Sequence, residues 1–263
     1  MLTERQIAGI FCLLETLMTN NKTIITIKKC ANISFQKKDE IFALHLQYFD
    51  NTTFEKFNKD FTEKQWCIII QDIYNKIVGY STIQLIFDKI LSLPVLVLFS
   101  GDTLVSKEYW NTNALVIGFS NFIEYISQLF PDHKKYWLLI TKGYRTYRFL
   151  PLYFKQYYPA YNIETPKEIS ILMNSICTKK FGDRYDSQKG LVLSNDKNDF
   201  LRPEMAVVPP GKKKDPNVCY FLRRNPNYHK GDELVCLTSI EKENIINRLV
   251  YRYIKKYPVS IDK

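Results

Sequence analysis

The order of hydrophobic segments between residues 65 and 159 constrains the fold more than any other feature of this chain. WCIII, IVGYSTIQLIF and VLVLFSGD read as three successive strands, and the turn DIYNK joins the first two. A helical run, the strand YWLLITKG and a second helical run follow. A strand–helix–strand crossover makes two strands parallel, so this order predicts an open α/β sheet with a ligand site at the carboxyl ends of a parallel pair.

Helical and strand patterns continue on both sides of that segment. Residues 182–216 are rich in loop-forming residues, and Pro151 predicts a kink or a restart inside one helix. We therefore expect one domain over residues 1–263: an N-terminal helix and strand (1–34), a core (35–160) and a C-terminal part (161–263). The further elements expected are helices over 3–20, 35–49, 113–130, 144–158, 166–180 and 240–256, a short helix TFEKFNKDF, a strand over 23–30, and a hairpin of VCYFLRR with DELVCLT.

Charge and composition limit the classes of function. The sequence has no run of 18 apolar residues and its start lacks the features of a signal peptide, so we expect a cytoplasmic protein without a membrane span. Its six cysteines are scattered without a CxxC pair, which predicts reduced thiols and no metal site. The net charge of +10 calls for an acidic partner, either nucleic acid, an anionic membrane or an acidic protein. Because no arginine-rich recognition helix accompanies that charge, nucleic acid binding is the weaker inference.

Aromatic residues are abundant, with 18 Tyr and 17 Phe. They predict either a bulky core or a wide apolar cavity for a long ligand, and the two interpretations are compatible.

Several segments carry a resemblance to a known family: YSTIQLI, FSGDTLVSKEYW, YWLLITKGYRTYRFLP and NPNYHKGDELVCL. Over about residues 40–237 the chain resembles the GNAT acyltransferase superfamily. More narrowly, it resembles the bacterial, often cyanobacterial, enzymes that attach fatty acyl groups to Lys or ornithine side chains of ribosomal peptides. The resemblance implies an α/β fold with a mixed, mostly antiparallel sheet, helices on both faces, and one splayed parallel strand pair that admits the pantetheine arm of an acyl donor.

One departure from that family concerns the donor phosphates. Typical GNAT acetyltransferases have a Gln/Arg-x-x-Gly-x-Gly/Ala loop after the central strand, whose backbone holds the coenzyme A pyrophosphate. Here the segment is SGDTLVSKEYWNTNA, and bulky residues such as Tyr109 and Trp110 replace the glycines. Three alternatives follow from this loss. The chain has no acyl donor, or the donor is acyl carrier protein in its acylated form (acyl-ACP), whose acidic surface suits the basic charge of this chain. In the third alternative the donor is acyl-CoA, and Lys107, Lys142 or Arg145 neutralises its phosphates.

Two residues are the candidates for proton transfer. Asp102 ends the central strand, where the thioester should lie; the alternative is that it caps a turn. His45 is the second candidate, since histidine titrates near neutrality, although an isolated histidine is often structural. The pair His45 and Asp102 resembles the arrangement in RTX toxin-activating lysine acyltransferases, which place a catalytic His on their first helix and an Asp on their central strand.

The helical segment KGYRTYRFLP supplies further candidates. Tyr144 would protonate the departing thiolate and Arg145 would hold a donor phosphate; alternatively, the tyrosine packs and the arginine is solvated. Asp232 and Glu233 are candidates to orient an incoming ammonium group. The residues predicted to contact the donor are Phe99, Ser100, Gly101, Thr103, Trp110, Lys142 and Arg145.

The sequence thus favours an N-acyltransferase that moves a long-chain acyl group from acyl-ACP or acyl-CoA to a Lys or ornithine side chain of a peptide. A homoserine lactone or a polyamine as acceptor remains open. The alternative is a non-catalytic module of the same fold that binds an acyl carrier protein or a peptide. Nucleic acid binding through the Lys212–Lys214 loop is a third possibility.

Overall fold

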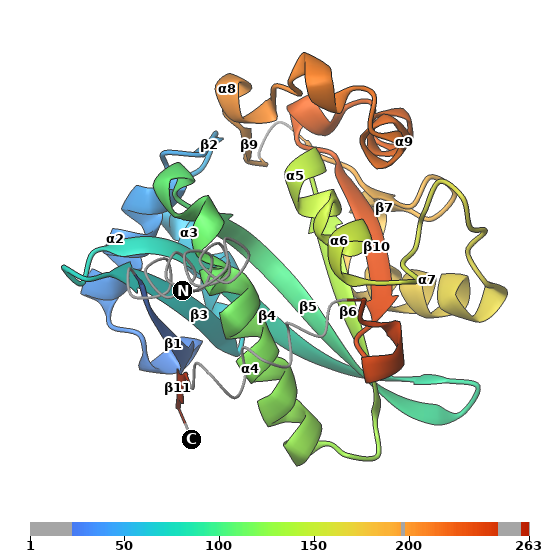
Figure 1. The fold of residues 1–263 in the computed structure, drawn as a ribbon, viewed down its shortest axis with the longest axis horizontal. Helices are drawn as coiled ribbons and strands as arrows, with labels where there is room; N and C mark the ends of the chain where they lie inside the picture. The colour runs from blue at the N-terminus through green and yellow to red at the C-terminus, as the bar shows by residue number, and fades with distance from the viewer. Residues whose placement is uncertain (1–22, 196–197, 247–258, 263) are drawn as a thin grey trace, which may run out of the picture.

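One nine-stranded sheet forms the centre of the molecule (Figure 1). The computed structural model describes residues 23–195, 198–246 and 259–262, so the helix expected over residues 3–20 lies outside the described residues. Strands β5 and β6 pair in parallel, as do β1 and β11, and the other neighbours are antiparallel. In spatial order the strands are β11 (Ser260–Ile261), β1 (Thr23–Lys29), β3 (Trp66–Asp72), β4 (Ile77–Ile90), β5 (Leu93–Val105), β6 (Lys134–Thr141), β10 (Glu233–Ser239), β8 (Leu191–Val192) and β7 (Tyr185–Asp186).

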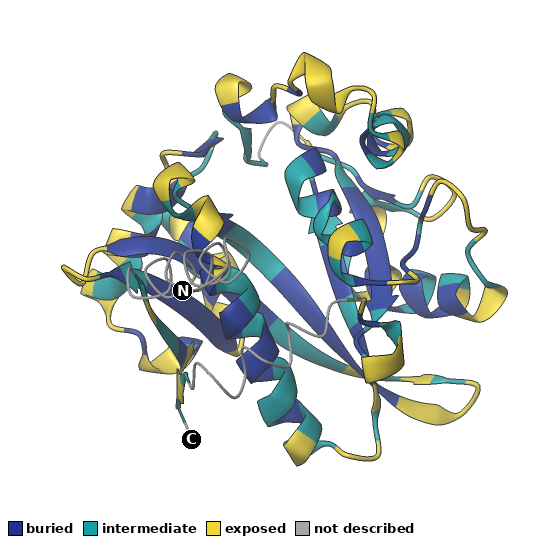
Figure 2. Cartoon of the chain, viewed as in Figure 1, coloured by how far each residue is buried: buried dark blue, intermediate teal, exposed yellow. Residues whose placement is uncertain are grey.

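Helices cover both faces of this sheet. Alternate residues of a strand point to opposite faces. On β3, Ile68 and Ile70 therefore face the side covered by α4 (Ala114–Leu129), while Cys67 and Ile69 face the side covered by α2 (Phe35–His45) and α3 (Phe54–Thr62). Farther along the first of these faces, α5 (Tyr144–Tyr147), α6 (Phe149–Tyr153) and α9 (Pro216–Arg224) complete the same core. Helix α7 (Lys167–Phe181) covers the rest of that second face. Figure 2 shows the resulting buried sheet between partly exposed helices.

The central strand β5 is buried on both sides, as its continuous apolar run predicts. Leu96 and Leu98 belong to the core under α4, and Val95, Val97 and Phe99 belong to the core under α7. This strand therefore separates two hydrophobic layers.

The two parallel strands β5 and β6 part near their carboxyl ends. Their register runs from Val95 opposite Lys134 to Ser100 opposite Leu139. Farther along, β5 pairs with β4, up to Val105 opposite Gly79, while β6 pairs with β10, up to Thr141 opposite Leu234. Figure 1 shows the two strands diverging. The predicted α/β class, with a mixed, mostly antiparallel sheet, a splayed parallel pair and helices on both faces, is confirmed.

The predicted C-terminal hairpin is wrong, because VCYFLRR lies in α9 rather than in a strand. The Asp215 carboxylate accepts hydrogen bonds from the backbone N–H groups of Asn217 and Val218, and Pro216 occupies the first helical position. Val218 and Phe221 then share the buried side of the helix. Strand β10 instead pairs with β6 and β8.

Other predicted boundaries also change. The helix expected over 144–158 is two short helices that end at Tyr153, with Pro151 in the first turn of α6, where a missing N–H costs little. The helix expected over 35–49 ends at His45. Shortly after it comes β2 (Phe49–Asp50), which forms a separate two-stranded sheet with β9 (Phe200–Leu201). Residues 242–244 form a single 3-10 turn, so no α-helix begins at 240, and residues 247–256 lie outside the described range.

In the part of the chain that the structure describes, no helix is both long and apolar enough to cross a bilayer. The cysteines described there are free thiols, and no cluster of three His, Cys, Asp or Glu side chains within it could hold a metal ion.

Candidate active site

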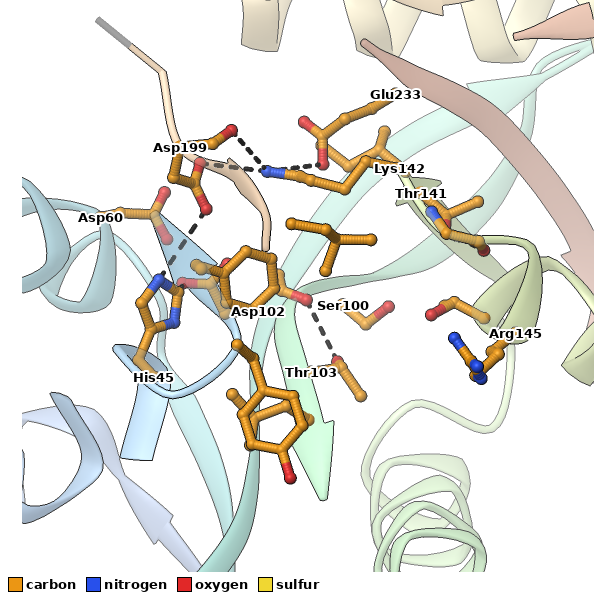
Figure 3. Close-up of a pocket in the computed structure, with 18 of the residues that line it drawn as sticks. His45, Asp60, Ser100, Asp102, Thr103, Thr141, Lys142, Arg145, Asp199 and Glu233 are labelled. Carbon is orange, nitrogen blue, oxygen red and sulfur yellow. Dashed lines mark hydrogen bonds and ion pairs between the residues drawn. The ribbon is translucent and has the colours of Figure 1, made fainter. Parts of the chain in front are cut away.

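A cavity of about 790 Å³ lies where β5 and β6 part. Its walls come from the end of β5, the residues just after β6, helices α3 and α7, and the segment before β9. Ten of the thirteen candidate residues line this cavity: His45, Phe99, Ser100, Gly101, Asp102, Thr103, Trp110, Lys142, Arg145 and Glu233. Figure 3 shows His45, Asp60, Asp102 and Asp199 gathered on one side, with Arg145 on the other.

A β-bulge directs Asp102 toward His45. Two residues of β5, Gly101 and Asp102, lie between the pairs Ser100/Ile83 and Thr103/Ser81, where β4 has one residue, Thr82. The extra residue interrupts the alternation of the strand, as bulges beside functional sites commonly do. Without it, Asp102 would lie on the same face as Ser100, whose Oγ accepts a hydrogen bond from Trp137 Nε1 at 2.9 Å. With it, Asp102 Oδ2 lies 3.9 Å from His45 Nδ1.

Glycine is required at the first position of that bulge. A Cβ atom on Gly101 would lie 2.5 Å from Thr82 Oγ1 and 2.9 Å from Lys64 Cε. Any larger residue would therefore displace its neighbours and the bulge.

The imidazole of His45 is fixed by a hydrogen bond and by aromatic packing. Its Nδ1 lies 2.7 Å from the hydroxyl of Tyr80, and its ring stacks on Phe49 at a centroid distance of 4.4 Å. Its Nε2 lies 3.8 Å from Asp199 Oδ2. Burial lowers the pKa of His45 to about 4, because it outweighs the opposing effect of the Asp199 carboxylate. His45 is consequently neutral at pH 7 and able to accept a proton.

Asp102 has the opposite shift. Burial in the cavity wall, with the negative charges of Asp60 and Asp199 acting in the same direction, raises the pKa of Asp102 to about 8. Strongly shifted carboxyl groups in a cleft are typical of functional sites.

The ammonium group of Lys142 lies between the carboxylates of Asp199 and Glu233, which also line the cavity. Its Nζ lies 3.0 Å from Asp199 Oδ1 and 3.7 Å from Glu233 Oε1. Burial would lower the pKa of Lys142, but Glu233 and Asp199 raise it overall, so the side chain stays cationic. Burial likewise raises the pKa of Glu233, although Lys142 opposes this effect. The ammonium group predicted to bind phosphate is thus already matched by protein carboxylates.

Arg145 and Trp110 lie on the other side of the sheet from His45. The Arg145 guanidinium stacks on the rings of Tyr144 and Trp110, at 4.8 and 5.3 Å from their centroids, and its Nη1 donates to the Met205 carbonyl at 2.9 Å. Among the described residues, no carboxylate oxygen lies within 4.0 Å of this guanidinium. Its positive charge is therefore available to an anion in the cavity.

Some predicted residues lie away from the cavity. Tyr144 is 4% exposed, belongs to the hydrophobic core and does not line the cavity, so its predicted role as a proton donor has no geometric support. Lys107 does not line it either. Asp232 accepts a hydrogen bond from the backbone of Ser194 at 2.8 Å, which indicates a structural role.

Sequence reasoning missed three residues that lie close to His45: Tyr80, Asp60 and Asp199. Tyr80 falls within the segment YSTIQLI, where a polar hydroxyl on a buried strand was the available signal. Asp60 resembles any charged residue of an amphipathic helix, and Asp199 lies in the loop-rich segment, so neither had a distinguishing local pattern.

Comparison with known proteins gives weak structural likenesses. No family model and no curated protein matches the sequence. A probable N-acyltransferase from Enterococcus faecalis V583 matches with 15% identity and a TM-score of 0.37, over 51% of this chain and 33% of that one. The GNAT family N-acetyltransferase YhbS from Escherichia coli, in complex with CoA, matches with 10% identity and a TM-score of 0.36, over 49% and 67%. Arabidopsis thaliana NAA60, in complex with a bisubstrate analogue, matches with 12% identity and a TM-score of 0.37, over 51% and 86%.

The Enterococcus and Escherichia structures are described as a probable N-acyltransferase and an N-acetyltransferase. The match spans only a third of the Enterococcus chain, and every TM-score given is below 0.5. Conclusions about this chain therefore come from its own strand topology and cavity.

Proposed function

We propose that this chain is an N-acyltransferase that moves an acyl group from a thioester donor to a primary amine. The finer proposal is a long-chain fatty acyl group, carried by acyl-ACP or CoA, and a Lys or ornithine side chain of a ribosomal peptide as acceptor. The observation that carries the proposal is the parting of β5 and β6 beside Asp102, which opens a cavity through the sheet.

The parting strands suit the arm of a thioester donor. Pantetheine is a narrow chain with two amides, and beyond Ser100 and Leu139 the facing edges of β5 and β6 border the cavity instead of pairing with each other. Arg145, on the α5 side, offers a cation to a donor phosphate.

The cavity walls also suit a fatty acyl chain. Aromatic rings from both sides of the sheet line it, and its volume lies in the upper part of the range for ligand pockets. The rings are those of Tyr48, Phe49, Phe57, Phe99, Tyr109, Trp110, Phe149, Tyr153 and Phe181.

The other side of the cavity suits an amine. Asp60, Asp102, Asp199 and Glu233 all line it. Lys64 pairs with Asp60, and Lys142 pairs with Asp199 and Glu233, so of these four Asp102 is the carboxyl group left to bind an ammonium group. The acceptor would enter as R–NH₃⁺ and lose one proton before attack.

The Asp102–His45 pair accounts for the proton transfers of this reaction. Asp102, with a pKa close to the working pH, is suited to take the proton, and the neutral His45 beside it forms one titrating unit with it. The free amine then attacks the thioester carbonyl, the C–N bond forms, and the C–S bond breaks. The nitrogen loses a second proton, the thiolate gains one, and the products are an amide, a thiol and one proton released to water.

The direct test is incubation with palmitoyl-ACP or palmitoyl-CoA and a lysine-containing peptide, followed by mass spectrometry. We expect a palmitoylated amine, and we expect His45→Gln and Asp102→Asn each to lower the rate roughly 10²-fold. His133→Gln is the matched control, because His133 packs on Phe130 and Phe87 and does not line the cavity. If folded protein transfers no acyl group from either donor to any amine, the chain is a binding module of the same fold.

A further inference from the structure

Two cations line the cavity from the end of α7. Lys180 lies in the last turn of that helix, and Arg184 ends the 3-10 turn Gly182–Arg184 that follows it. The Lys180 ammonium lies 4.5 Å from the Phe99 ring centroid and 5.7 Å from that of Phe181. Lys180 and Arg184 thus present two positive charges to the cavity from one short stretch of chain.

These charges lack the counter-ions that Lys64 and Lys142 have in the same cavity. Lys64 pairs with Asp60 at 2.7 Å, and Lys142 pairs with Asp199 at 3.0 Å. Within the described ranges, neither Lys180 nor Arg184 has a carboxylate oxygen within 4.0 Å. Their hydrogen bonds go to neutral groups, from Lys180 to the Gln84 side chain and from Arg184 Nε to the Leu193 carbonyl at 3.1 Å.

Partly buried cations without counter-ions are energetically costly. Burial, with the neighbouring charge of Lys64, lowers the pKa of Lys180 to about 8. A ligand that brought a negative group to this wall would relieve the cost.

The position of the two cations indicates which substrate supplies that group. Phe99 and Phe181 pack in the core under α7, on the face of the sheet that also carries α2 and α3. That is the side of His45 and Asp60, whereas Arg145 lies on the opposite side, with α5 and Trp110. An anion at Lys180 would therefore belong to the acceptor and not to the phosphate of the donor.

We propose that Lys180 and Arg184 form a subsite for a carboxylate carried by the acceptor. The acceptor is then recognised by two charges, its ammonium group beside Asp60, Asp102 and Asp199 and its carboxylate at the end of α7. This inference rests on the proposed acyl transfer and narrows its substrate to amines that also bear a carboxylate. The source of that carboxylate is either the α-carboxylate of an amino acid or an acidic side chain next to the target lysine.

Kinetics with paired acceptors test the subsite and its source. One pair is Nα-acetyl-lysine and its amide, and the other is a lysine peptide with Glu or Gln next to the lysine. For the wild-type protein we expect kcat/KM to be roughly tenfold higher for the carboxylate member of at least one pair, mainly through KM, as for other partly buried charge pairs.

Variants of the α7 end separate this subsite from a general effect of charge. Lys180→Met and Arg184→Met should bring the preference close to one, and Lys180→Arg should retain it. Lys179→Met is the matched control, since Lys179 is the neighbouring residue but is exposed and pairs with Asp88 at 3.2 Å. An equal rate for both members of both pairs, or a preference that survives Lys180→Met, overturns the subsite.

A binding measurement distinguishes failure of the subsite from failure of the proposed function. After reductive ¹³C-methylation of the wild-type lysines, the NMR titration of Lys180 should move to higher pH when Nα-acetyl-lysine is added, and not when its amide is added. That shift without acyl transfer would support the subsite in a protein that is not an acyltransferase. Acyl transfer without any shift would support the proposed acyltransferase activity and contradict the subsite.

Discussion

Burial shifts the pKa values of Asp102 and His45 in opposite directions. The pKa of the carboxyl rises and that of the imidazole falls, so between about pH 4 and pH 8 both groups are uncharged in the folded protein. Without substrate, Asp102 and His45 thus do not form a buried ion pair with each other. An ammonium group that enters between Asp102 and Asp199 changes this balance by favouring the ionised carboxyl, which is the form that can accept its proton.

This charge state makes stability depend on pH in a defined window. Between its ordinary pKa of 3.8 and about 8, Asp102 holds a proton in the folded chain that it lacks in the unfolded chain, so stability falls as pH rises. His45 acts in the opposite sense, but only between about 4 and 6.5, where the unfolded chain binds its proton. From pH 6.5 to 8, Asp102 is the member of the pair that still makes the stability depend on pH.

We therefore expect Asp102→Asn to stabilise the protein increasingly from pH 6.5 to 8. Its free energy of unfolding should gain roughly 2 kcal/mol on the wild type across this window, at about 1.4 kcal/mol per pH unit. Urea unfolding at both pH values measures the difference. Asp132→Asn, at an exposed loop position, is the control and should follow the wild type. Equal pH dependence of Asp102→Asn and the wild type would contradict the raised pKa.

At the same scale, the sequence identified residues only where a pattern or a resemblance marked them. His45 and Asp102 are marked by their places on the helix expected over residues 35–49 and on the central strand, and the structure brings them within 3.9 Å. Asp199 contacts His45 from a loop far along the chain, and no local period encodes such a contact.

Among the elements, the β-bulge and α9 show what local patterns omit. A continuous apolar run predicts strand β5 but not the extra residue that directs Asp102, since a bulge depends on pairing with β4. VCYFLRR is rich in β-branched and aromatic residues, which favours a strand, but the preceding Asp215-Pro216 is a helix start that outweighs this propensity.

The bulge gives a test at this scale. Gly101→Ala should destabilise the protein by about 1–3 kcal/mol, because the new methyl would overlap Thr82 Oγ1. It should also lower the acylation rate, since a shifted bulge moves Asp102 relative to His45. Thermal unfolding and the acylation assay measure the two effects.

Two further variants isolate the overlap as the cause. Gly211→Ala is the matched control, because a Cβ there meets no atom within 4 Å, and it should be neutral. Thr82→Ala combined with Gly101→Ala should recover much of the loss, as expected for side chains in direct contact. A Gly101→Ala protein as stable and active as the wild type would show that the bulge tolerates a side chain.

At the scale of the molecule, the sequence of the central segment predicts the main architecture, but no sequence pattern predicts the strands at the ends of the sheet. The strands and crossover of residues 65–141 lie as their hydrophobic runs predict. Strand β11 has two residues and pairs with β1 across nearly the whole chain length, so no periodicity could indicate it.

Charge is also distributed unevenly at this scale. The chain carries 37 Lys and Arg against 27 Asp and Glu, yet carboxyl groups gather around His45 in the cavity. An excess of positive charge attracts an acidic carrier protein from a distance, while the carboxyl group of Asp102 would bind the cationic acceptor inside the cavity. The two substrates would thus be drawn by charges of opposite sign.

This difference predicts that the salt dependence of the reaction is set by the donor. With palmitoyl-ACP, kcat/KM should fall at least about tenfold between 20 and 200 mM NaCl while kcat stays nearly constant, because salt screens the steering of two charged proteins. With palmitoyl-pantetheine, which has no phosphate, the same change should alter kcat/KM less than about twofold. The acceptor is the same in both assays, so its own salt dependence cancels in the ratio. Equal salt dependence with both donors would mean that the net charge of +10 has no role in recruiting a carrier protein.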